Sequence, residues 1–133
     1  GEELIIENAE TAISFACEMT GAVIDNFTAG PVYLEKAKRG GHEWIIEFIK
    51  EPQNLEQFTK ILDDTLRKIN SDYDAKRMHN LALIAPKIHN VAEGTFYNWK
   101  KKRGKLGGQN KVPRLSNSRE FLEEILEMTH SNV

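Results

Sequence analysis

The feature that most constrains this fold is an amphipathic stretch in the middle of the chain. Between residues 55 and 69, apolar residues recur every three or four positions, which is the spacing of one face of an α-helix. Asn54 and Gln57 have the spacing of a capping pair at its start. The stretch therefore predicts a helix that must bury one face against another part of the chain. The apolar stripe consists of Leu55, Phe58, Leu62, Leu66 and Ile69.

Two apolar segments before this helix can supply the surface against which it packs. Residues 22–33 are rich in β-branched and aromatic side chains, and residues 44–49 alternate two sets of side chains, as a strand does. A charged turn with two glycines, residues 35–41, separates them. We predict two strands joined as a hairpin. Gly30-Pro31 predicts a break in the first strand near Pro31, or its confinement to a sheet edge.

Shorter patterns complete the order of elements. We predict a first helix that ends before Gly21, a short helix at 71–78 and a third strand at 87–91. A helix started by Thr95 runs to Arg103, and a capping pair of Asn117 and Glu120 opens the last helix. The predicted order is αββααβαα. It indicates an α+β fold with two layers, in which helices cover a small, mostly antiparallel sheet of about three to four strands.

Composition limits the classes of function. With 133 residues, 40% of them hydrophobic, we predict a single domain spanning residues 1–133. A net charge of −2 gives no general attraction to nucleic acid or membranes, and no apolar run reaches the ~18 residues of a membrane span. One cysteine, Cys17, favours a reducing, cytoplasmic location. The four histidines are scattered, so we predict no metal site.

A basic, glycine-rich segment is the strongest candidate for a functional loop. It runs from Arg103 to Arg114, after a Gly94-Thr95-Phe96 helix start. Its glycines allow the backbone to approach a ligand closely, and its cations could meet an anion. Lys111 and Arg114 lie away from any predicted helix end, which favours a function over a role in helix stability. The glycine spacing matches no phosphate-binding motif.

The cations at 100–105 have a simpler explanation. Lysines at the end of a helix complement its dipole and are commonly solvated. Two alternatives remain open: the surface formed by residues 100–114 binds a protein or an RNA, or the domain is purely structural. Phe96 and Trp99 have the spacing of a core helix, and no known nucleic-acid motif surrounds them.

Several motifs together resemble one known family. In chain order they are Gly1-Glu2-Glu3-Leu4, Gly41-His42, Asn70-Ser71 with Tyr73, Gly94-Thr95-Phe96, and the R-G-x-x-x-x-Q-x-K-x-P-R pattern of 103–114. In these motifs the chain resembles the C-terminal domain of the acyl acid–amido synthetases. This family, also labelled auxin-responsive promoter proteins, belongs to the adenylate-forming superfamily. Gly107-Gly108 favours a bacterial member over a plant one.

The resemblance implies a role as the mobile lid of an ATP-dependent ligase. In such enzymes ATP and a carboxylic acid give an acyl-adenylate, which an amino acid then attacks. The implied partners are the enzyme's own N-terminal adenylation domain and these two substrates, with neither nucleic acid nor membrane. Mg-ATP is expected for the intact enzyme and no cofactor for this segment, which we expect to be inactive alone.

The resemblance also assigns roles to the basic loop. Lys111 is the candidate lid lysine for catalysis, although its loop differs from the superfamily's P-K-x-x-x-G-K pattern, and Lys102 or Lys105 could supply the charge instead. The candidates for contacting nucleotide or substrate are Arg114, Gln109, Lys105 and Arg103.

Overall fold

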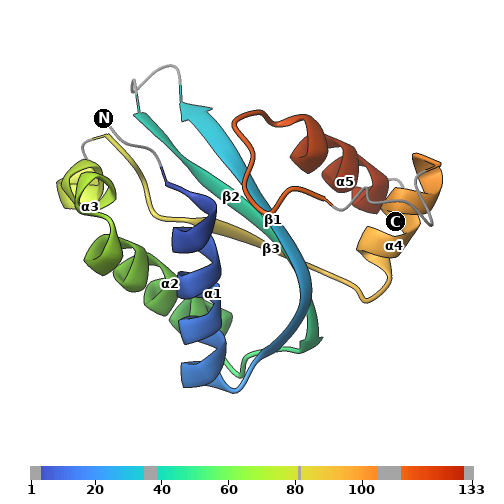
Figure 1. Ribbon diagram of the computed structural model, residues 1–133, viewed down its shortest axis with the longest axis horizontal. Coiled ribbons are helices and arrows are strands. Elements are labelled where there is room, and N and C mark those ends of the chain that lie inside the picture. Colours follow the sequence, from blue (N-terminus) through green and yellow to red (C-terminus); the bar gives the residue numbers. More distant parts are fainter. Residues whose placement is uncertain (1–3, 35–38, 81, 105–111, 131–133) are drawn as a thin grey trace.

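The computed structural model describes residues 4–34, 39–80, 82–104 and 112–130 (Figure 1). Within them the strands β1 (Val23–Leu34), β2 (Arg39–Lys50) and β3 (Lys87–Val91) form one sheet in the order β1-β2-β3. β1 and β2 are antiparallel, whereas β2 and β3 are parallel. The α+β class, the small sheet and the predicted order of elements are confirmed. The helices are α1 (Ile6–Thr20), α2 (Leu55–Ile69), α3 (Ser71–Arg77), α4 (Thr95–Lys102) and α5 (Glu120–His130), with the 3₁₀ turn η2 (Met78–Asn80) after α3.

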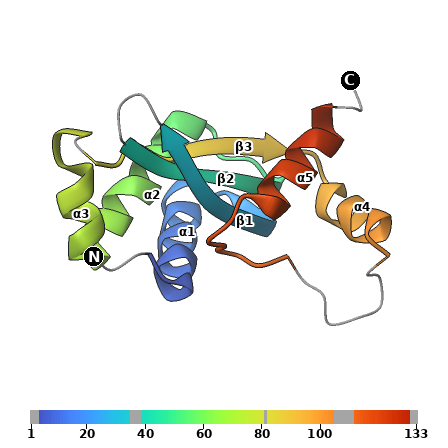
Figure 2. The ribbon, with the colours of Figure 1, turned by 90° about the horizontal axis from the view of Figure 1, so that it is seen from above.

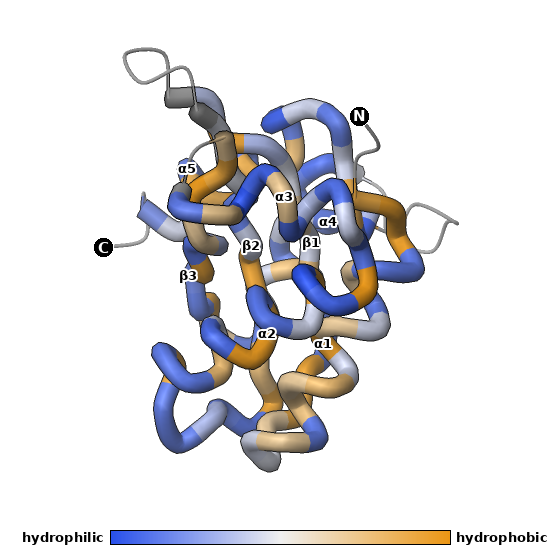
Figure 3. The backbone as a smooth tube through the Cα atoms, turned by 90° about the vertical axis from the view of Figure 1, so that its left-hand side faces the viewer, coloured by the Kyte–Doolittle hydropathy of each residue, from blue (hydrophilic) through white to orange (hydrophobic). Residues whose placement is uncertain are grey.

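The sheet and the pair α1 and α2 form the two main layers, while α4 and α5 pack at the other side (Figures 1 and 2). Successive side chains of a strand point to opposite faces, so β2 contributes to both sides. Trp44 and Ile46 lie in the core under α1 and α2, and Ile45 packs with α5. Figure 3 shows hydrophobic residues recurring among hydrophilic ones along α2. Its buried apolar residues are Phe58, Leu62 and Leu66.

The first strand does not break at Pro31. β1 stays paired with β2 through Gly30 and Pro31, so the predicted break is wrong, while the alternative, an edge position, is confirmed. Proline has no N–H to donate, and an edge strand needs only half of its backbone groups for the ladder. Gly30 is required for another reason. A Cβ at this position would lie 2.7 Å from Cδ1 of Leu122, where α5 crosses β1.

Most of the predicted helix ends are confirmed. The Asn54 side chain accepts a hydrogen bond of 3.0 Å from the amide of Gln57, and Gly21 ends α1 with a φ of 77°. At α5 the hydroxyl of Ser118 accepts from the amide of Glu120, in place of the predicted Asn117. The cap of α4 also differs from the prediction, as described below.

Candidate functional site

The structure fixes the two ends of the basic loop. Arg103 and Arg114 lie within the described residues, whereas Lys105, Gln109 and Lys111 lie outside them. The loop is therefore best understood through the groups that attach its ends to the core. Each end contacts a different helix.

Arg103 binds α5 at the first end of the loop. Its guanidinium lies 3.4 Å from a carboxylate oxygen of Glu124 and 3.5 Å from one of Glu120. It also lies over the rings of Trp99 and Phe121, 5.3 and 5.2 Å from their centroids, at cation–π distance. Arg103 thus joins the end of α4 to α5.

The second end of the loop is joined to β1 by its backbone. Val112 is buried in the core shared with α5. The hydroxyl of Thr28, itself buried, donates to the Pro113 carbonyl at 2.5 Å. The amide of Ala29 donates to the carbonyl of Arg114 at 3.0 Å. Residues 112–116 therefore return to the core along the free edge of β1.

The side chain of Arg114 turns toward α1. It pairs with Glu10, and its guanidinium lies 5.6 Å from the ring centroid of Phe27. About half of this side chain is exposed to solvent. Arg103 and Arg114 have no partner in common, so the structure places them in two separate anchors rather than in one cationic site.

A buried carboxylate explains the Gly94-Thr95-Phe96 motif. Glu47 of β2 is 3% exposed and accepts hydrogen bonds from the amides of Gly94 (2.9 Å) and Phe96 (3.0 Å). Gly94, not Thr95, is the N-cap of α4, with a φ of 91° that favours glycine. A negative charge here satisfies otherwise unpaired amides and complements the helix dipole. The motif thus has a structural role, because its amides bind Glu47 and so position α4.

A second buried carboxylate ties α5 to the sheet. Glu43 of β2 contacts Nη1 of Arg119 at 2.7 Å and Nε2 of His89 at 2.6 Å. Burial tends to raise the pKa of Glu43, but hydrogen bonds from His89 and Arg119 and the charge of Arg119 outweigh it, so this pKa lies below its usual value. Arg119 also donates to the Pro31 carbonyl at 2.7 Å. The cluster joins all three strands to α5.

The sequence reasoning missed both of these carboxylates. Their signal was the position of Glu43 and Glu47, four positions apart, on the two sides of the apolar residues 44–46. An even spacing in a strand places two side chains on the same face. A charge that faces a core needs a buried partner, and this requirement could have marked both residues as structural.

The described part of the chain shows no cluster of three or more histidine, cysteine, aspartate or glutamate side chains suited to hold a metal ion. None of its helices combines the length and apolar character needed to cross a membrane. What the geometry offers is the two described ends of the basic segment, Arg103 and residues 112–116, each held on the core. Such an arrangement can present a cation to a ligand bound by another part of a protein.

Comparison with known proteins identifies the family. Residues 7–120 match the family model described as the GH3 family C-terminal domain, so the chain belongs to this family. The resemblance to the acyl acid–amido synthetases is thereby confirmed, and bacterial origin stays a prediction. No curated protein sequence matches the chain.

Solved structures share the fold. The GH3.15 acyl acid amido synthetase superposes with a TM-score of 0.69 at 18% identity, over 91% of this chain and 23% of that one. A structure titled AtGH3.15 acyl acid amido synthetase in complex with 2,4-DB gives a TM-score of 0.71 at 15% identity, over 95% and 24% of the two chains. This chain thus spans about a quarter of the length of the synthetases that it matches.

Proposed function

We propose that this chain is the C-terminal lid of an ATP-dependent acid–amino acid ligase that forms an acyl-adenylate, and that the chain is inactive alone. Membership of the GH3 family supports this proposal. The structural observation that carries it is the anchoring of the basic loop at Arg103 and at residues 112–116. A lid must deliver its charged group in a fixed geometry, and anchors at both ends serve that need.

Lys111 is the proposed catalytic lysine. It directly precedes Val112, which is buried in the core, so a rotation of the domain would carry Lys111 with it. In the first step the acid's carboxylate oxygen attacks the α-phosphorus of ATP, and pyrophosphate leaves. A lysine ammonium would stabilise the negative charge that develops there. In the second step the amine attacks the acyl carbon and AMP leaves.

The roles of the two arginines follow from their contacts. Arg103 and Arg114 are proposed to position the loop, because each is bound to carboxylates and aromatic rings of this same domain. Direct contact of these arginines, or of Lys105 and Gln109, with nucleotide stays a prediction. Mg-ATP and a cytoplasmic location are likewise expected for the intact enzyme.

The decisive experiment uses the full-length enzyme that contains this chain. AMP release from ATP is measured with pooled carboxylic acids and amino acids, with and without the segment that begins at Gly1. Dependence of AMP formation on both substrates, and its loss on truncation, is the expected result. Turnover that survives truncation would contradict the lid role.

A point variant tests the lysine. Lys111→Ala should lower acid-dependent exchange of pyrophosphate into ATP by about 10²–10³-fold, the range for loss of one group that stabilises a transition state. The matched control is Lys101→Ala, because Lys101 is an exposed lysine on α4. Equal exchange by both variants and the wild type would remove Lys111 from the reaction.

A further inference from the structure

The outer edge of β3 is an open edge of the described sheet. The strand order β1-β2-β3 makes β1 and β3 the two edge strands. The edge of β1 is covered, because Ala29 exchanges backbone hydrogen bonds with Arg114 and Ser116. Within the described residues, β3 pairs with β2 alone. The outward amides and carbonyls of β3 can therefore pair with a further strand.

Two hollows beside β3 leave room for the side chains of such a strand. A groove of about 520 Å³ lies between β3 and α5, with residues 88–92 on one side and Leu126, Thr129 and His130 on the other. A second hollow, of about 410 Å³, lies at the end of β3, where residues 90–93 approach the end of β2. An added strand would thus meet an uncovered backbone and open space along it.

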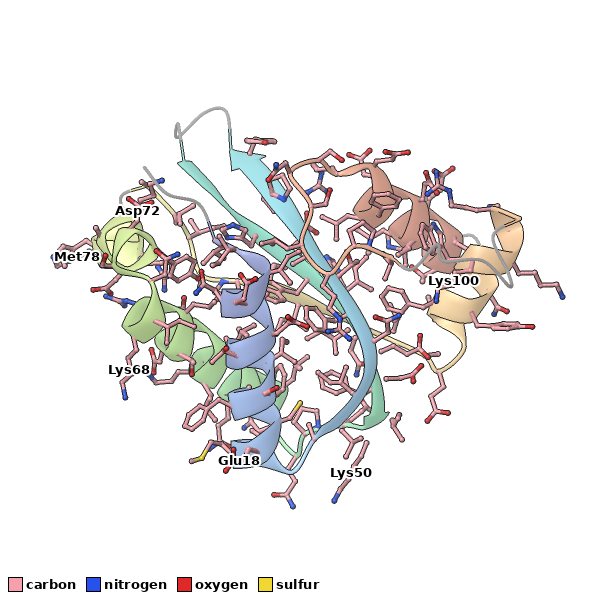
Figure 4. All side chains as sticks on the ribbon, viewed as in Figure 1. Glu18, Lys50, Lys68, Asp72, Met78 and Lys100 are labelled. Atoms are coloured by element: carbon pink, nitrogen blue, oxygen red, sulfur yellow. The ribbon has the colours of Figure 1, made fainter. Side chains whose placement is uncertain are left out.

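Opposite charges mark the two ends of this edge. Lys87 is the first residue of β3 and Glu93 lies two residues beyond its last, and both are exposed. No ion pair among the described residues involves either side chain. β3 runs from the side of the molecule that carries Asp72 of α3 toward the side that carries Lys100 of α4 (Figures 1 and 4). Lys87 is therefore at the α3 end of the edge and Glu93 at the α4 end.

An edge with opposite charges at its two ends is complementary to itself in the antiparallel orientation. With a two-fold axis beside His89, Lys87 of one copy lies opposite Val91 of the other. Glu93 of that copy is then a diagonal neighbour of Lys87, within reach of a long side chain. A parallel arrangement would instead bring Lys87 beside Lys87, which is unfavourable. The charges therefore favour one orientation of a second copy.

We propose that two copies of this chain associate through β3. The two strands pair in antiparallel orientation across a two-fold axis, so that two three-stranded sheets become one continuous sheet. Lys87 of each copy pairs with Glu93 of the other. β3 has only five residues, so the interface is small and the association is weak and concentration-dependent. This inference does not depend on the proposed ligase activity.

The first test measures the association of the 133-residue chain by analytical ultracentrifugation. From about 1 μM to about 1 mM, the range of weak complexes, we expect a reversible change from monomer to dimer. The second readout is the ¹H–¹⁵N spectrum over the same range. Concentration-dependent amide shifts should centre on Lys87–Val91, because the outward amides of β3 gain hydrogen-bond partners.

Charge reversal tests the orientation. Lys87→Glu and Glu93→Lys should each weaken association by about tenfold or more, because both opposite-charge contacts of the dimer become like-charge contacts. An equal mixture of the two variants should associate again, because every contact in the mixed dimer joins opposite charges. The matched control is Lys101→Glu, which makes the same change of charge at an exposed lysine of α4 outside both hollows. It should associate as the wild type does.

Three results would overturn the inference. The first is a chain that stays monomeric up to about 1 mM. The second is a dimer whose concentration-dependent amide shifts lie away from β3. The third is a mixture of Lys87→Glu and Glu93→Lys that associates no more strongly than either variant alone. Each of these results leaves AMP release by the full-length enzyme untouched, so failure of this inference and failure of the ligase proposal are distinguishable.

Discussion

Oε1 of Glu47 lies 3.0 Å from the amide nitrogen of Phe96 and accepts its hydrogen bond, although the two residues are 49 positions apart. The other carboxylate oxygen of Glu47 accepts from Gly94 at 2.9 Å. α4 has only eight residues, and a helix of that length is not stable in isolation. Its position therefore depends on contacts such as this one. Because α4 leads into Arg103, Glu47 also supports the start of the basic loop.

The first prediction concerns this contact. Glu47→Ala removes both acceptors from the buried N-terminus of α4, and we expect the free energy of unfolding to fall by about 1–3 kcal/mol. Glu47→Gln keeps one acceptor oxygen and should cost less. Urea unfolding followed by far-UV circular dichroism measures both. Glu93→Gln, an exposed glutamate just before Gly94, is the control. An effect of Glu47→Ala no larger than the control's would show that Glu47 does not hold α4.

A second prediction separates two roles for Arg114. Its contact with Glu10 is half-exposed, so its loss should change stability by only about 0–1 kcal/mol. If Arg114 positions the loop, Arg114→Glu should lower pyrophosphate exchange in the full-length enzyme, and adding Glu10→Arg should restore part of it. If Arg114 contacts the nucleotide directly, the doubly changed enzyme should stay as slow as the single variant. The exchange rates of the two variants decide between these roles.

A third prediction concerns the buried ion pair between Asp63 of α2 and Arg77 of α3. Oδ2 of Asp63 lies 2.6 Å from Nη2 of Arg77, and the side chain of each is about 10% exposed. Arg77→Met leaves the Asp63 carboxylate without this cation, so the free energy of unfolding should fall by about 3–5 kcal/mol. Arg67→Met is the control, because the pair of Arg67 with Asp74 is far more exposed. It should change stability by about 0–1 kcal/mol in the same urea experiment. Equal losses would contradict the role given to burial.

Whether the sequence could predict a contact depends on how far apart in the chain its two residues lie. Helix α2 and its Asn54 cap were predictable because they rest on residues three or four positions apart. The sequence also singled out the segment 103–114, of which the structure describes residues 103–104 and 112–114. It could not show that Arg114 pairs with Glu10, which is 104 positions away, or that Glu43 meets His89 at a distance of 46 positions. Such partners are set by the packing of the sheet against α1 and α5, and no local pattern encodes them.

The fourth prediction is a pH dependence due to His42. Burial, together with the charge of Lys76, lowers its pKa in the folded chain to about 4, below the ordinary 6.5 that applies on unfolding. Between these pH values the unfolded chain takes up a proton that the folded chain does not. Stability is therefore lost as pH falls from about 6.5 to 4, by about 2–3 kcal/mol in total.

A substitution isolates this contribution. His42→Gln should lose less stability than the wild type between pH 7 and 4, when unfolding by urea is measured at each pH. The lowered pKa values of Glu43 and Asp63 also reduce stability in acid, but they act mainly as pH falls through those lowered values and are present in both proteins. His130→Gln, in the last turn of α5, is the control. Parallel curves for His42→Gln and the wild type would remove His42 as the source.

The last prediction tests how closely α5 must approach β1. A Cβ on Gly30 would lie 2.7 Å from Cδ1 of Leu122 and 3.0 Å from the carbonyl oxygen of Ser118, so Gly30→Ala must displace the Leu122 side chain or the chain at Ser118, just before α5. Such overpacking should lower the free energy of unfolding by about 1–3 kcal/mol. Leu122→Ala alone should cost about 2–5 kcal/mol, because Leu122 is buried. In the double variant the removed leucine makes room for the new Cβ, so its cost should be smaller than the sum of the two. A cost equal to that sum in urea unfolding would show that Gly30 and Leu122 do not meet, and that some other constraint requires glycine in β1.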